Sequence, residues 1–189
     1  VRAVQFPLRH LRICWAFYAK IQQRYAEIKP DSPPLACIRT FGCQQNVSDS
    51  ERIKGMLILC GYTLTEEITE ADFIIFNTCA VREHAEDRVY GNIGKVKQIK
   101  KDRPKTIAAV CGCMAQQEHM KEKILKSYPY VNLLFGTHAL YKFPELLYKQ
   151  LKSHKRVFDT SGDEIGMIFE GVHIKRDRDI RANLPIMYG

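Results

Sequence analysis

Three of the seven cysteines in the sequence each follow an apolar segment, at similar intervals. Cys43 comes after residues 35–41, and Cys79 lies 36 residues further on. Cys113 follows after another 34 residues. Each interval suits one strand–helix unit. Because parallel strands end at the same edge of a sheet, we expect the three thiols to lie together at that edge.

The number of these thiols limits the groups that they can hold. Three thiolates suit a four-iron cluster in which one iron keeps an open position. Structural zinc normally takes four protein ligands, and a disulfide leaves one thiol over. A helix is expected soon after each cysteine, and helix N-termini stabilise negative charge on sulfur. The alternative is three unrelated cysteines buried in turns.

Polar residues next to these cysteines could support such a cluster. We expect them to donate hydrogen bonds to sulfur or to orient an exchangeable ligand on the open iron. For Asn46, capping of a helix is an equally good interpretation. Gly42 and Gly112 allow the backbone to approach a bulky group closely. The polar residues are Gln44, Gln45, Asn46, Asn77, Thr78 and Arg82.

The other cysteines and the histidines have simpler interpretations. Cys37 and Cys111 fall in expected strands, and Cys60 falls on an apolar helix stripe, so all three are predicted to be core residues. His84 and His119 are predicted to be solvated surface residues.

Apolar runs alternate with helical patterns from residue 35 onward. Strands are predicted at 35–41, 62–65, 73–76, 106–110, 131–135 and 157–158. Helices are predicted at 83–103, 115–127 and 144–151, and one more begins at a capping box formed by Ser48 and Glu51. The pattern indicates an α/β fold with a mostly parallel sheet of about five strands and helices on both faces, as in Rossmann and flavodoxin-like proteins.

The two ends of the sequence differ from this pattern. Residues 1–34 are predicted to be an N-terminal helical extension, with an amphipathic helix marked by Leu8, Leu11, Trp15, Tyr18 and Tyr25. Pro30, Pro33 and Pro34 end that helix. Residues 159–189 carry few periodic apolar positions and are expected to be a linker toward a further domain that this sequence does not contain.

The composition suggests classes of partner. Lys and Arg total 29 against 21 Asp and Glu, a net charge of +8, which favours nucleic acid but is equally explained by solubility. No run approaches the roughly 20 apolar residues of a membrane span. The cysteine pattern is typical of a cytoplasmic protein. A cluster-free module that binds nucleic acid or a small molecule stays open, although no Gly-x-Gly-x-x-Gly follows a strand.

Three segments together resemble a known family. TFGCQQN at 40–46, NTCAVRE at 77–83 and GCMAQ at 112–116 are similar to motifs of the methylthiotransferase family of radical S-adenosylmethionine enzymes. The variants resemble the branch that makes 2-methylthio-isopentenyladenosine in tRNA. The similarity extends from about residue 35 to 189, and residues 35–158 match the family's N-terminal cluster-binding domain.

The resemblance implies a cofactor set and a reaction. Cys43, Cys79 and Cys113 would ligate an auxiliary [4Fe–4S] cluster whose open iron presents sulfur. S-adenosylmethionine and a second [4Fe–4S] cluster would belong to the absent radical domain. The acceptor would be C2 of the isopentenylated adenosine beside the tRNA anticodon, in a monomeric enzyme. The Cys-x-x-x-Cys-x-x-Cys motif of that domain is missing, so this chain alone should be inactive.

Overall fold

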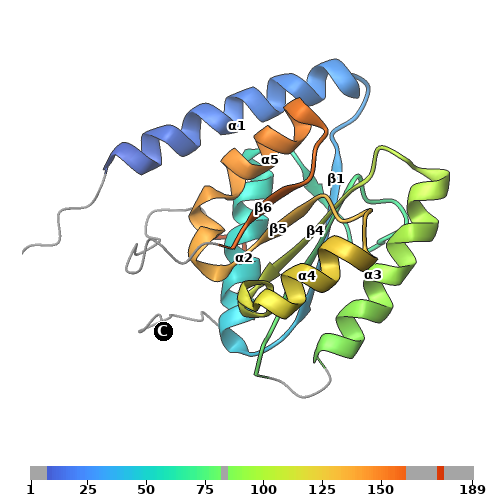
Figure 1. The fold of residues 1–189 in the computed structure, drawn as a ribbon. Helices are drawn as coiled ribbons and strands as arrows, with labels where there is room; N and C mark the ends of the chain where they lie inside the picture. The colour runs from blue at the N-terminus through green and yellow to red at the C-terminus, as the bar shows by residue number, and fades with distance from the viewer. Residues whose placement is uncertain (1–7, 82–84, 161–173, 177–189) are drawn as a thin grey trace, which may run out of the picture.

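A computed structural model describes residues 8–81, 85–160 and 174–176 and contains one six-stranded sheet (Figure 1). All six strands run parallel, in the order β2-β1-β3-β4-β5-β6. The predicted parallel α/β fold is therefore confirmed, with six strands rather than about five. The strands are β1 (Leu35–Phe41), β2 (Thr63–Leu64), β3 (Phe73–Thr78), β4 (Ile107–Gly112), β5 (Leu133–Phe135) and β6 (Val157–Asp159).

Helices cover both faces of the sheet, as predicted. One face carries α1 (Leu8–Ile28), α2 (Gln44–Leu59) and α5 (Phe143–Ser153), and the other carries α3 (Ala85–Asp102) and α4 (Glu118–Ser127) (Figure 1). Two short 3₁₀ helices, η1 (Cys113–Gln116) and η2 (Thr137–Lys142), follow β4 and β5. Among the described residues, no helix is both long and apolar enough to cross a membrane.

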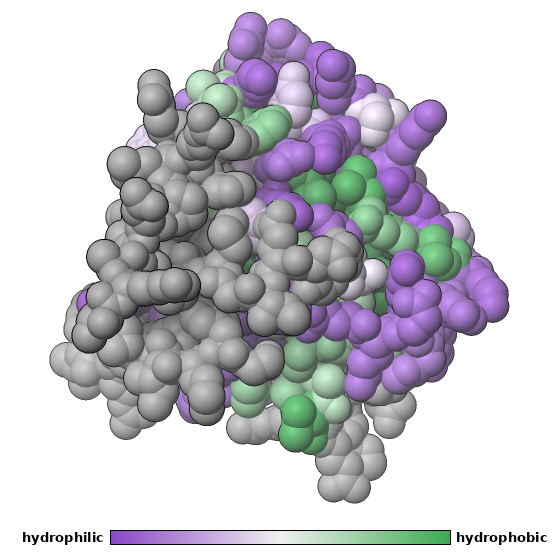
Figure 2. Space-filling model, turned by 60° about the vertical axis from the view of Figure 1, so that its left-hand side comes forward, coloured by the Kyte–Doolittle hydropathy of each residue, from purple (hydrophilic) through white to green (hydrophobic). Residues whose placement is uncertain are grey.

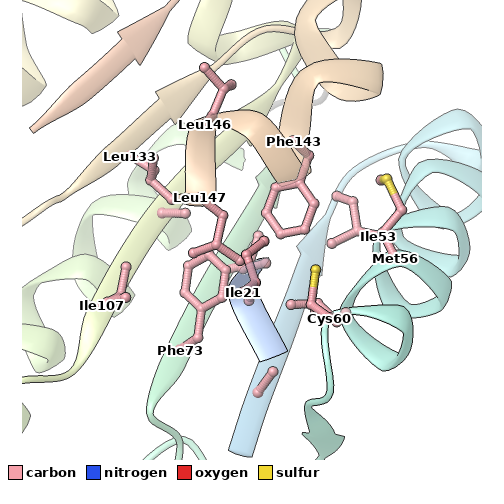
Figure 3. Close-up of a cluster of buried hydrophobic side chains, with 14 of the residues drawn as sticks. Ile21, Ile53, Met56, Cys60, Phe73, Ile107, Leu133, Phe143, Leu146 and Leu147 are labelled. Atoms are coloured by element: carbon pink, nitrogen blue, oxygen red, sulfur yellow. The ribbon is translucent and has the colours of Figure 1, made fainter. Parts of the chain in front are cut away.

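The central strands are buried on both faces, which explains their continuous apolar runs. In β3, Phe73 and Ile75 pack into the core under α1, α2 and α5, while Ile74 and Phe76 pack into the core under α3 and α4. Figure 3 shows the first of these cores, where Phe73 lies among side chains from several helices. Where Figure 2 draws described residues in colour, the surface is largely hydrophilic and is interrupted by apolar areas, as is normal for protein surfaces.

Helix α1 confirms the helix predicted within residues 1–34. Tyr18, Ile21 and Tyr25 are buried in the same core as Phe73, so the helix packs onto the body of the fold. Trp15, predicted for the apolar stripe, is 60% exposed instead. The domain boundaries at 34/35 and 158/159 remain predictions.

Two predicted helices differ in detail. Helix α2 begins at Gln44 rather than near Ser48, because Cys43 is its N-cap and Asn46 accepts a hydrogen bond from the Cys43 N–H. The helix expected over 115–127 is divided into η1 and α4, because Gln117 has extended backbone angles. On α4, Met120 and Ile124 are fully buried, whereas Leu125 is 41% exposed.

The register of the three central strands sets the position of their ends. Phe41 of β1 pairs with Thr78 of β3, and Thr78 pairs with Gly112 of β4. The three strands therefore end level with one another. This common end is the edge at which ligands of open parallel sheets usually bind.

Candidate metal centre

The structure places all three candidate cysteines at this common edge. Cys79 follows β3 directly, Cys113 follows β4 directly, and Cys43 lies two residues after the end of β1. These strands are neighbours in the sheet, and the strand order reverses between β1 and β3. Cys43 and Cys79 thus flank the topological switch point, where doubly wound folds form their binding sites, and Cys113 lies one strand further along.

Backbone N–H groups point at two of the sulfur atoms. The Ala80 N–H donates to the Cys113 Sγ at 3.0 Å, and the Val81 N–H donates to the Cys79 Sγ at 3.4 Å. Hydrogen bonds of this kind stabilise negative charge on sulfur. The loop after β3 therefore supports its own cysteine and the cysteine of the next strand.

The other two candidate cysteines influence the pKa of the Cys113 thiol. Burial raises the pKa of the Cys113 thiol, the Ala80 N–H opposes this shift, and neighbouring Cys79 and Cys43 raise the pKa further. Thiols that disfavour each other's ionisation gain from a shared cation, because the positive charge removes the repulsion between thiolates.

All six cysteines whose side chains are described are free thiols. Cys37, Cys60 and Cys111 are buried within the two cores, as predicted. Within residues 8–81, 85–160 and 174–176, no three His, Cys, Asp or Glu side chains are arranged as ligands of a single metal ion. Ligands of a cluster bind different irons, so an arrangement around one ion is not the one that a cluster needs.

Gly112 permits the close packing of these loops. Its φ of +99° lies in the left-handed region, and a Cβ atom there would lie 2.2 Å from the Thr78 carbonyl oxygen. A side chain is therefore excluded both by backbone conformation and by space. The turn that carries Cys113 depends on this glycine.

The predicted supporting residues have different positions. Asn46, Asn77 and Thr78 are buried, and the Thr78 Oγ1 donates to the Cys111 carbonyl at 2.9 Å. Gln44 is exposed. Gln45 donates to the Asp49 Oδ1 at 2.9 Å. Arg82 and His84 lie outside the described residues, and His119 is exposed, as predicted.

The buried polar residues of α2 were not predicted from the sequence. Asp49, Ser50 and Arg52 are only 4%, 1% and 7% exposed, although the sequence around them is strongly polar. Ser50 shares a hydrogen bond with the Thr40 hydroxyl at 2.7 Å. The stretch resembles a solvated helix face, and its nearness to the first cysteine is the only signal that could have identified it.

Asp49 gives a testable dependence of stability on pH. Burial raises the pKa of its carboxyl to about 6, against the effect of Arg52, whose Nη1 lies 3.7 Å from the Asp49 Oδ1. The unfolded value is about 3.9, so between these values the folded state binds more protons and stability falls as pH rises. The Asp49→Asn variant lacks this titrating group and serves as the reference. As the pH rises from about 4.5 to about 7.5, the free energy of unfolding of the unmodified chain should fall by about 2 kcal/mol more than that of the variant. Urea denaturation at several pH values measures this, and parallel curves for the two proteins would contradict it.

Comparison with known proteins agrees with the motifs. Residues 36–136 match the family described as "Uncharacterized protein family UPF0004". The chain is 50% identical over 155 residues to the tRNA-2-methylthio-N(6)-dimethylallyladenosine synthase of Clostridium perfringens. This alignment covers 82% of this chain and 34% of the synthase. The synthases of the same name from Caldicellulosiruptor saccharolyticus and Acetivibrio thermocellus are 50% and 48% identical over 80% and 86% of the chain.

This chain spans about a third of the length of these curated relatives, 32% and 34% for the last two. The family match covers more than half of the chain and includes all three candidate cysteines. On this evidence, the chain belongs to the UPF0004 family.

Proposed function

We propose that this chain is the iron–sulfur domain of a tRNA methylthiotransferase and acts within a longer protein. The observation that carries the proposal is the level ending of three adjacent strands, each followed by a cysteine. The names of relatives at about half identity support the choice of reaction. The proposed ligands are Cys43, Cys79 and Cys113.

The residues present fit a [4Fe–4S] cluster. Soft thiolates suit iron–sulfur clusters, and the N–H groups of Ala80 and Val81 already point at sulfur. When bound, such a cluster supplies an iron with an exchangeable position that can carry the sulfur to be transferred. The chain's own residues hold the sulfur ligands and stabilise their charge.

The partners follow from the same proposal. The acceptor is tRNA, at the isopentenylated adenosine beside the anticodon, and the net charge of +8 favours such an anionic partner. S-adenosylmethionine and a second [4Fe–4S] cluster are bound by a further domain of the longer protein. We propose a monomer that works in the cytoplasm. The alternative is a cluster-free α/β binding module, which would be colourless when pure.

The experiment that tests the sulfur-donor role addresses the open iron. We expect the chain, reconstituted with iron and sulfide without oxygen, to show an electron paramagnetic resonance signal when reduced. Methanethiolate or sulfide should change that signal, because either can occupy a position that no protein ligand fills. A cluster whose signal is unchanged by both would have four protein ligands, and the sulfur-donor role would then be withdrawn.

A further inference from the structure

The sheet fixes two of the three candidate ligands but not the third. The Cys79 N–H donates to the Phe41 carbonyl at 3.0 Å, which extends the pairing of β1 with β3. Cys113 directly follows Gly112, the last paired residue of β4. Cys43 lies beyond the last paired residue of β1, so the sheet pairing does not set its position.

The side chain of Asn46 makes the connection that the sheet does not provide. Its Oδ1 accepts from the Cys43 N–H at 3.0 Å and lies 3.3 Å from the Cys43 Sγ. Its Nδ2 donates to the Asn77 Oδ1 and to the Thr78 carbonyl, both at 3.0 Å. One amide thus joins the loop of the first cysteine to the strand end that carries the second.

Asn77 completes this connection from the side of β3. Its Nδ2 donates to the Asn46 carbonyl at 2.8 Å and to the Ser50 Oγ at 2.9 Å. Asn46 and Asn77 are 1% and 0% exposed. Because both amides are buried, losing one leaves unpaired polar groups that water cannot easily reach.

Gly42 provides the space that Asn46 occupies. A Cβ atom at residue 42 would lie 2.1 Å from the Asn46 Oδ1 and 2.5 Å from its Cγ. Any side chain at residue 42 must therefore displace the amide of Asn46. The Cys43 loop offers two independent ways to break the same connection, one at Asn46 and one at Gly42.

We propose that Asn46 is a positioning residue that sets Cys43 against Cys79 and Cys113 before any metal binds. Its role in ligand placement rests on the proposed function, whereas its effect on the geometry of the metal-free thiols does not. The two effects can therefore be measured separately.

The first measurement uses the metal-free, reduced 189-residue chain. Dibromobimane alkylates two thiols that lie close together, and mass spectrometry identifies the linked pairs. In Asn46→Ala and in Gly42→Ala, we expect links from Cys43 to the other two cysteines to form about tenfold more slowly. The Cys79–Cys113 link, which the β3–β4 pairing fixes, should change by less than about twofold.

Matched controls separate this effect from a general loss of stability. Asn92→Ala removes an amide that donates to the Arg88 carbonyl on α3, and Gly94→Ala adds a Cβ atom that meets nothing within 4 Å. Neither should change any of the three links. Asn46→Asp keeps the acceptor for the Cys43 N–H and serves as the test if Asn46→Ala does not fold.

The second measurement follows the reconstituted proteins. In Asn46→Ala and Gly42→Ala, transfer of iron to a chelator should be about tenfold faster than in the unmodified chain, and the electron paramagnetic resonance signal should be broadened or shifted. Folded variants with unchanged Cys43 links and unchanged chelation would overturn the proposal. If the unmodified chain forms no cluster but the Cys43 links still slow in the variants, the proposed function fails while the positioning effect stands.

Discussion

Replacing any one of Cys43, Cys79 and Cys113 by alanine should leave at most about a tenth of the iron and sulfide that the reconstituted chain retains. Each of these thiols follows one of three adjacent strands that end level with one another. A four-iron cluster with only two protein ligands has two unprotected irons and is easily lost. Iron and sulfide are counted per chain after gel filtration without oxygen.

Cys60→Ala and Cys111→Ala are the matched controls for this series. Both thiols are buried in the core under α1, α2 and α5, and Cys111 lies two residues before Cys113 in the sequence. The controls should retain the iron and sulfide of the unmodified chain. If Cys111→Ala lost the cluster and Cys113→Ala kept it, the ligand assignment would be wrong.

Gly112→Ala should destabilise the fold by roughly 3 kcal/mol or more. The methyl group would lie 2.2 Å from the Thr78 carbonyl oxygen and 2.6 Å from the Asn77 Oδ1, at a residue whose φ is +99°. The strand ends must move apart to admit it, so the variant should also retain less iron. Urea denaturation followed by circular dichroism measures the loss of stability.

Gly94→Ala is the control for the substitution itself. Gly94 lies within α3, and a Cβ atom there meets nothing within 4 Å. Alanine is a better helix former than glycine, so stability should be unchanged or higher by about 0.5–1 kcal/mol. Equal unfolding midpoints for Gly112→Ala and Gly94→Ala would show that the turn at residue 112 tolerates a side chain.

The architecture could be predicted because its signals are local. The run at 73–76 is apolar on both faces, which indicates a central parallel strand, and β1 has the bounds that its pattern predicts. The ends of elements were less predictable. Strand β3 continues through Asn77 and Thr78 because buried hydrogen bonds satisfy these polar side chains.

The candidate ligands could also be selected from the sequence, because the spacing of cysteines after strands is visible there. The side chains that support these ligands could not be predicted in this way. The first half of α2 is polar and reads as a solvated face, yet Asn46 and Ser50 are buried against Asn77. The start of α2 was misplaced because its N-cap is a cysteine, which is not a preferred capping residue. These features depend on contacts between distant segments, which periodicity does not encode.

The most direct test of the central claim is the ratio of iron to sulfide to protein in the reconstituted chain. We expect about four iron and about four sulfide per chain, and close to none in a variant in which Cys43, Cys79 and Cys113 are all alanine. Finding one metal ion per chain without sulfide would show that these cysteines do not hold a four-iron cluster. The same conclusion would follow if the triple variant retained as much iron and sulfide as the unmodified chain.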